Sequence, residues 1–115
     1  MPMIALTTTA DITPGLARQL AAGFGEAITL IPGQSDLRLM FTYTSGAPMY
    51  LEGQVRSAAF VEVSTFGNAP PEAYEAFTAA TVELLERVLE MQMLPENILI
   101  KYSETILWYG TGITG

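Results

Sequence analysis

The sequence predicts a mixed α/β (α+β) fold, in which two tandem β-α-β units form a four-stranded sheet with both helices on one face. Three observations support this. A strand pattern, a helical pattern and a second strand pattern follow one another twice. Both helical patterns begin at prolines, and each carries a single apolar stripe. The 115 residues suit one domain, 1–115, with repeated halves at about 1–57 and 58–115.

The first half opens with residues 3–9, which are apolar or β-branched and predict a strand. Thr13 and Pro14 then form an N-cap and a first helical position. Residues 37–43 alternate between apolar and other side chains, which predicts a second strand. The apolar stripe of the helix between them consists of Ala17, Leu20, Ala21, Phe24 and Ile28.

The second half repeats this order with a strand at 59–66, a helix from Pro70-Pro71, a turn at 94–97 and a strand at 98–102. The apolar stripe of its helix consists of Ala73, Phe77, Ala80, Leu84, Val88 and Met91. The opposite side carries Glu72, Glu75, Glu83, Glu86 and Glu90. We interpret this acidic row as a solvated helix face rather than a metal site.

Each β-α-β unit joins two parallel strands through a right-handed crossover. Two helices on one face leave the other face of the sheet uncovered, with Met3, Met40 and Phe60 on it. We therefore expect oligomerisation to cover this face. The apolar tail at 106–109 is expected to pack on a neighbouring subunit.

The composition excludes several classes of function. Half of the residues are hydrophobic and 15% are charged, which excludes an intrinsically disordered chain. The net charge of −7 repels phosphate backbones, so we expect no nucleic-acid partner. Cysteine and histidine are absent, which excludes thiol catalysis, Ser-His-Asp triads and the common zinc sites. We find no signal-peptide pattern and no membrane-length apolar run, and expect a cytoplasmic protein without a membrane partner.

A proline at position two, two β-α-β units of this length and an aromatic C-terminal tail occur together in this chain. In this combination the chain resembles the tautomerase superfamily, and within it macrophage migration inhibitory factor and its bacterial homologues. Residues 64–67, 83–87 and 94–102 also look like the second half of that family. The likeness covers nearly the whole chain.

The resemblance implies a homotrimer with active sites at the subunit interfaces and no cofactor. It assigns Pro2 the role of catalytic acid and base, once Met1 has been removed and the proline nitrogen is a free amine. An apolar pocket disfavours the charged form of an amine and so lowers its pKa toward neutrality. The alternative is structural, because a proline also suits the first position of a strand.

The remaining substrate-binding positions come from the same resemblance. Thr65 matches a residue whose backbone contacts substrate, and Ser64 flanks it. Lys101 replaces an asparagine that the neighbouring subunit contributes to the pocket, and Leu99 replaces a tyrosine on the same face of that strand. Trp108 or Tyr109 is expected to form an aromatic wall, and Tyr50 to lie on the pocket rim.

The chain also departs from the family. It has no lysine near residues 31–34 to bind a substrate carboxylate, and no Cys-x-x-Cys, which excludes thiol oxidoreductase activity. Lys101 or Arg38 would have to supply the positive charge, and related tautomerases use an arginine on the strand that matches Arg38. For both residues the alternative is an ordinary ion pair, for instance with Glu62 or Glu104.

The resulting hypothesis is a cofactor-independent keto–enol tautomerase that acts on an α-keto acid or a similar small enolisable carbonyl. The alternative from another class is a cytokine-like binding protein with a vestigial proline pocket and a protein receptor, released without a signal peptide. A related dehalogenase or decarboxylase is a third reading. It needs an arginine pair and an acid that activates water, and the second half of the chain offers only Arg87.

Overall fold

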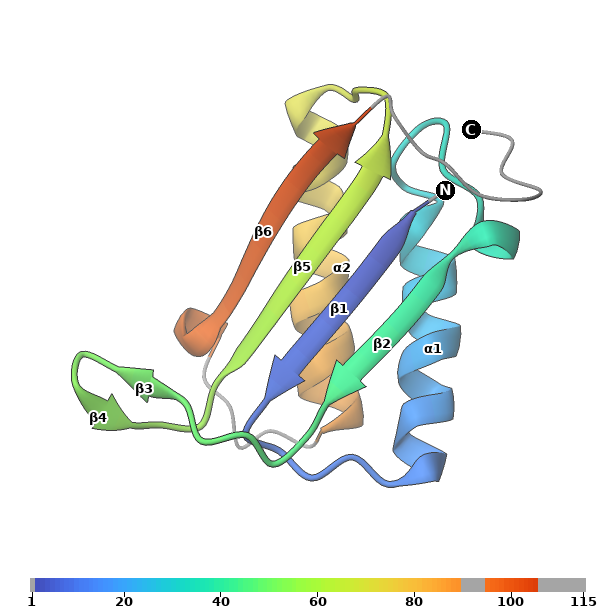
Figure 1. The fold of residues 1–115 in the computed structure, drawn as a ribbon. Helices are drawn as coiled ribbons and strands as arrows, with labels where there is room; N and C mark the ends of the chain where they lie inside the picture. Colours follow the sequence, from blue (N-terminus) through green and yellow to red (C-terminus); the bar gives the residue numbers. More distant parts are fainter. Residues whose placement is uncertain (1, 90–94, 106–115) are drawn as a thin grey trace.

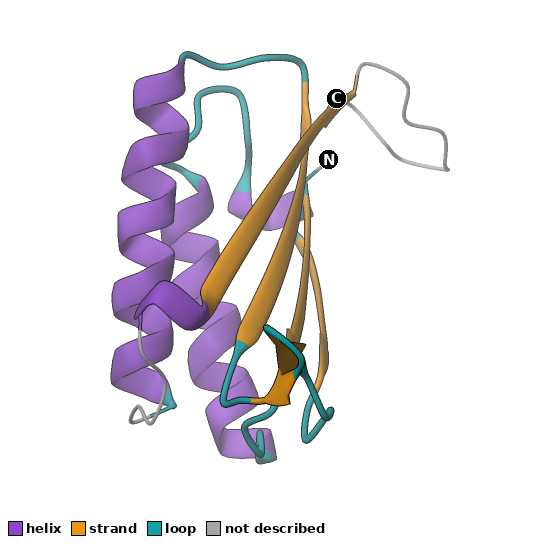
Figure 2. Cartoon of the chain, turned by 90° about the vertical axis from the view of Figure 1, so that its left-hand side faces the viewer, coloured by secondary structure: helices purple, strands orange, loops and turns teal. Residues whose placement is uncertain are grey.

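The computed structural model describes residues 2–89 and 95–105, which form one layer of sheet and one layer of helix (Figures 1 and 2). The main elements in chain order are β1 (Met3–Thr8), α1 (Pro14–Ile28), β2 (Met40–Thr44), β3 (Tyr50–Leu51), β4 (Gln54–Val55), β5 (Ala59–Phe66), α2 (Pro71–Val88) and β6 (Ile98–Thr105). Two 3-10 turns lie at Asp36–Arg38 and Pro95–Asn97.

The strand order β2-β1-β5-β6 confirms the two predicted β-α-β units. Within each unit the strands are parallel, β1 with β2 and β5 with β6. The two units meet through the antiparallel pair of β1 and β5 at the centre of the sheet. Both helices cover the same face, and Figure 2 shows the sheet open on its other side.

The core lies between the sheet and the helices. Alternate residues of β1 and β5 point into it, as the period of a strand requires. Its largest fully buried side chains come from both layers: Ile4, Leu6, Val61 and Val63 from the sheet, and Leu20, Phe24, Ile28, Phe77 and Leu85 from the helices.

Both helices begin near the predicted prolines, and the Thr13 hydroxyl accepts a hydrogen bond from Leu16 N–H at 3.2 Å. The predicted apolar stripe of α1 needs two corrections. Ala21 is exposed and Ala27 is buried in α1, because the helix turns toward both the sheet and α2. In α2, Ala80 is half-buried and packs against the core, as its predicted stripe requires.

The acidic face of α2 is confirmed for Glu72, Glu75, Glu83 and Glu86, which are all exposed. Glu90 and Met91 lie outside the described residues. This helix therefore presents its acids to solvent and its apolar stripe to the sheet, as an amphipathic helix does.

The predicted strand at 37–43 was wrong at its start. Residues Asp36–Arg38 form a 3-10 turn, and β2 begins only at Met40. The Ser35 hydroxyl accepts a hydrogen bond from Leu37 N–H at 3.2 Å, so local turn bonding competes with the alternating pattern. Arg38 consequently lies on a turn and not on a strand. The β3–β4 hairpin was not predicted, and β6 extends to Thr105 instead of ending at 102.

The uncovered face of the sheet carries the expected apolar side chains. Met3 and Phe60 are half-buried, whereas Met40 is 47% and Leu99 is 51% exposed. Within the described part of the chain, no helix is both long enough and apolar enough to cross a membrane.

Candidate active site

A cleft of about 620 Å³ opens at the start of β1. Three separate segments form its walls: Pro2, the α1–β2 connection with Pro32, Gly33, Ser35, Leu37 and Arg38, and the end of β5 with the residues after it, Phe66, Gly67 and Asn68. The cleft therefore depends on the sheet, because pairing of β1 with β2 and β5 brings these segments together.

Pro2 is buried and directly precedes β1. Its carbonyl accepts a hydrogen bond from Met40 N–H at 3.1 Å, which ties it to the first residue of β2. Pro2 therefore sits at a defined position in the cleft. A proline costs the sheet no hydrogen bond here, because it lies ahead of the first paired residue.

Arg38 alone is charged among the described residues that line the cleft. It is exposed and follows Leu37, whose side chain is 88% exposed. The 3-10 turn thus presents one cation and one apolar side chain on the same wall. An arginine guanidinium with adjacent apolar surface suits a small molecule that carries a carboxylate.

Gln34 connects two walls of the cleft. Its Nε2 donates to the Phe66 carbonyl at 2.8 Å, and its Oε1 accepts from Phe66 N–H at 3.2 Å. The side-chain amide therefore bonds to both backbone groups of Phe66, the last residue of β5, as the backbone of a neighbouring strand would. Sequence reasoning missed this residue, and no pattern in the sequence specified its partner.

A second hollow of about 490 Å³ adjoins the cleft, since both are lined by Gly67 and Asn68. Glu104 lies on its other side and accepts hydrogen bonds from Ala69 N–H at 3.1 Å and from the Tyr74 hydroxyl. Burial raises the pKa of Tyr74, and the bond to the Glu104 carboxylate raises that pKa further. Glu104 thus ties the end of β6 to the start of α2.

Thr65 and Ser64 do not place their side chains among those that line the cleft. Thr65 is buried on the helix side of the sheet, with its hydroxyl 3.2 Å from the Tyr74 hydroxyl. Ser64 is half-buried and alternates to the uncovered face. The expected role of Thr65 concerns its backbone, so it stays a prediction.

Lys101 and Leu99 lie on the uncovered face of β6, both exposed and outside the lining of the cleft. Lys101 is paired in register with Glu62 of β5, and Leu99 with Phe60. Both residues are expected to reach the pocket of a neighbouring subunit. A single chain does not test this, so it stays a prediction.

Tyr50 belongs to the β3–β4 hairpin, which lies at the far end of the sheet from the start of β1 (Figure 1). Its side chain is 67% exposed. A single chain therefore brings together Pro2 and Arg38 but not Tyr50. Trp108 and Tyr109 lie outside the described residues.

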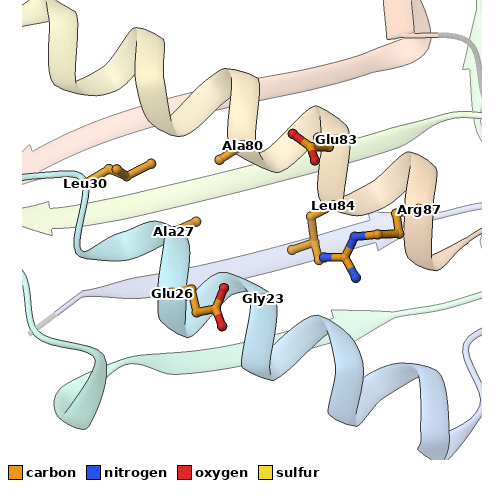
Figure 3. A pocket seen from close by; sticks show the side chains of 8 residues that line it. All are labelled: Gly23, Glu26, Ala27, Leu30, Ala80, Glu83, Leu84 and Arg87. Carbon is orange, nitrogen blue, oxygen red and sulfur yellow. The ribbon is translucent and has the colours of Figure 1, made fainter.

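A further hollow of about 280 Å³ lies between the two helices and shares no lining residue with the cleft (Figure 3). Glu26 of α1 and Glu83 and Arg87 of α2 stand on its walls. Among the described residues, no three acidic side chains come together as metal ligands would. The cleft at Pro2 is the better candidate, because it combines an apolar lining with a single cation.

Comparison with solved structures shows the class of fold. MIF2 from Leishmania major superposes with a TM-score of 0.86 at 19% identity, over 97% of this chain and 95% of that one. A Q0 fused 4-OT symmetric trimer gives 0.78 at 15% identity, over 97% and 94%. Pt0534, solved after inactivation by 2-oxo-3-pentynoate, gives 0.76 at 11% identity, over 90% and 85%.

The chain therefore has the fold of macrophage migration inhibitory factor and related tautomerase-superfamily proteins, which confirms the resemblance at the level of fold. No protein-family model matches the sequence. No curated protein matches it either.

Proposed function

We propose that the protein is a cofactor-independent keto–enol tautomerase that uses the Pro2 nitrogen as its acid and base. The observation that carries the proposal is the burial of Pro2 in a cleft whose one charged lining residue, within the described chain, is Arg38. The substrate class that fits is a small α-keto acid, with a carboxylate for Arg38 and an enolisable carbon for Pro2.

The chemistry requires Pro2 to be the first residue, because an amide nitrogen is not basic. The free amine takes a proton from the carbon next to the carbonyl, and the C–H electrons form the new C=C bond. The protonated amine then returns that proton to the carbonyl oxygen, to which the C=O π electrons have moved, and this completes the enol and restores the neutral amine. Burial of Pro2 in the cleft and the Arg38 cation both favour the neutral amine, so its pKa should fall below the usual ~8 of an α-amino group.

The site is proposed to be completed in a homotrimer. The uncovered face of the sheet exposes the apolar side chains of Met40 and Leu99, which contact with another subunit would bury. One structural neighbour is a symmetric trimer. In this arrangement the neighbouring subunit supplies Lys101 and Leu99. Tyr50 lies on the rim and Trp108 or Tyr109 forms the aromatic wall, while the Thr65 backbone, flanked by Ser64, contacts the substrate.

The direct test is ultraviolet-monitored ketonisation of phenylenolpyruvate and hydroxyphenylpyruvate by the chain that starts at Pro2. A chain with one added residue before Pro2 should be inactive, whereas Pro2→Gly should keep part of the activity because it keeps an amine. Equal turnover by the extended and the mature chain would show that Pro2 is not the base.

A covalent probe gives a second readout. The α-keto acid 2-oxo-3-pentynoate, which inactivates Pt0534, should add to a neutral Pro2 amine and not to the extended chain. Intact mass spectrometry with peptide mapping would locate the adduct. A mature chain that turns over no enol and gains no adduct would favour the alternative of a binding protein with a vestigial pocket.

A further inference from the structure

We infer that Gln34 is a positioning residue for Pro2. Its side-chain amide bonds to the first hydrogen-bonding position of β5 that lies beyond the residues paired with β1, and these bonds hold two walls of the cleft together. The inference rests on the proposed function, in which the Pro2 nitrogen moves the proton. Gln34 is not among the residues that line the cleft, so it acts through the residues it fixes.

The hydrogen-bond pattern of β5 defines this place. Thr9 N–H donates to the Ala58 carbonyl at 3.1 Å, and at the other end of β1 Met3 is opposite Ser64. Between antiparallel strands such bonded positions recur at every second residue. Phe66 is the next position of this series on β5, and it lies beyond the first residue of β1.

Gln34 fills that position completely. Both backbone groups of Phe66 bond to its amide, the carbonyl at 2.8 Å and the N–H at 3.2 Å. The next residue, Gly67, turns its N–H to the other side and donates to the Thr105 carbonyl of β6 at 2.9 Å. The Phe66 N–H and carbonyl, which point toward the β1 side of the sheet, are therefore bonded to a side chain from the α1–β2 connection.

Two consequences follow for the cleft. With Phe66 bonded to Gln34, the pairing of β1 with β5 ends at Met3 opposite Ser64, and Pro2 lies beyond it at the cleft. The hydrogen bonds of the Gln34 amide also link the α1–β2 connection, which includes Arg38, to the segment of Phe66 and Gly67. Gln34 thus adds a second tie between the two walls, beside the bond from Met40 N–H to the Pro2 carbonyl, and both ties set the spacing between Pro2 and Arg38.

This role predicts a chemical effect, because proton transfer is sensitive to position. A displacement of about 1 Å at a reacting group reduces rate by roughly a hundredfold. Loss of the Gln34 bonds should lower kcat more than it changes KM, since proton transfer by Pro2 depends on position more steeply than the attraction between the Arg38 cation and a carboxylate does. A residue that only stabilised the fold would leave the ionisation of Pro2 unchanged.

The test compares Gln34→Leu and Gln34→Glu with Gln19→Leu, a matched control on the exposed face of α1. All variants are made as chains that start at Pro2. Three properties are measured: hydrogen exchange of the Phe66 amide, titration of the Pro2 amine by NMR with labelled proline, and kcat and KM for phenylenolpyruvate.

Gln34→Leu should speed exchange at Phe66 by about tenfold, the equivalent of one ordinary hydrogen bond. It should shift the Pro2 titration and lower kcat by roughly ten- to a hundredfold with a smaller change in KM. Gln34→Glu keeps the acceptor for Phe66 N–H and loses the donor, so its effects should be intermediate. Gln19→Leu should match the wild type in all three.

Unchanged exchange at Phe66 in Gln34→Leu would overturn the inference. So would faster exchange with an unchanged Pro2 titration, which would reduce Gln34 to a structural role. A wild-type protein that turned over no enol would contradict the proposed function without contradicting the role of Gln34. The exchange and titration data would still decide whether Gln34 positions Pro2.

Discussion

Gly23 of α1 lies against Leu84 of α2 so closely that a Cβ added to Gly23 would be 2.3 Å from Leu84 Cδ1 and 3.1 Å from Leu84 Cγ. Figure 3 shows the two residues facing each other across the helix pair. Leu84 is only 3% exposed, and because its Cγ as well as its Cδ atoms would be too close, a turn of the methyl groups into the neighbouring hollow would not remove the contact. The missing side chain at Gly23 therefore sets how closely the two helices pack.

We expect Gly23→Ala to destabilise the protein by about 1 kcal/mol. Overpacking a core costs roughly 1–3 kcal/mol, and the better helix propensity of alanine returns up to about 1 kcal/mol. Gly25→Ala is the matched control, since its Cβ would lie 3.9 Å from the nearest side-chain atom, and it should stabilise by about 0.5–1 kcal/mol. Urea unfolding measures both, and equal shifts of the same sign would contradict the packing argument.

Leu99→Glu should convert the proposed trimer into monomers. Leu99 is half-exposed on the uncovered face opposite Phe60, and an unpaired charge there would be buried in the interface at a high energetic cost. Light scattering at micromolar concentration measures the mass. Ala79→Glu on the exposed face of α2 is the control and should remain trimeric. A monomeric wild type would refute the trimer itself.

Arg38→Ala should raise KM for α-keto acids with little change in kcat. A charge-assisted hydrogen bond contributes about 1.5–3 kcal/mol, which corresponds to roughly ten- to a hundredfold in affinity. Methyl-ester substrates should respond much less, because they lack the carboxylate charge. Arg56→Ala in the region of the hairpin is the control. If acid and ester substrates responded equally, Arg38 would not bind the carboxylate.

Lys101→Ala tests whether a neighbouring subunit reaches the site. The cation should assist carboxylate binding and help keep Pro2 neutral, so the variant should raise KM for the acid and raise the apparent pKa of Pro2 in the pH–rate profile. Glu62→Gln, which removes the register partner of Lys101, is the comparison. An unchanged KM and pH profile in Lys101→Ala would show that Lys101 is a surface residue. Arg38 would then be the remaining candidate for carboxylate binding.

The stability of the protein should fall at alkaline pH. Burial and Glu104 raise the pKa of Tyr74, and burial raises the pKa of Tyr102. Tyrosines of the unfolded chain ionise near pH 10, before these two do in the folded protein. The stabilisation is therefore complete below about pH 10 and is lost as the pH rises through the folded-state pKa values.

Tyr74→Phe should reduce this alkaline loss and cost about 1–2 kcal/mol at pH 7, since it removes the bond to Glu104 at a half-exposed site. Tyr43→Phe on the exposed strand β2 is the control. Denaturant unfolding between pH 7 and 11 gives both numbers. An identical pH slope in Tyr74→Phe and the wild type would contradict the assignment.

Much of the fold could be predicted because its signals are local. Pro14 and Pro71 begin the helices, and the alternation in residues 59–66 marks β5 to the residue. The start of β2 could not be predicted, since the Ser35 turn and the alternating pattern conflict over the same residues. The β3–β4 hairpin was missed because its strands are only two residues long.

The candidate site divides in the same way. The sequence by itself determined the repeated β-α-β order, the exclusion of thiol and imidazole chemistry, and Pro2 as the residue to examine. Only the tertiary structure decided that Arg38 shares a cleft with Pro2 and that Gln34 pairs with Phe66. The physical reason is that caps, turns and periodicity act over a few neighbouring residues. The cleft arises instead where sheet register brings together segments that are far apart in the chain.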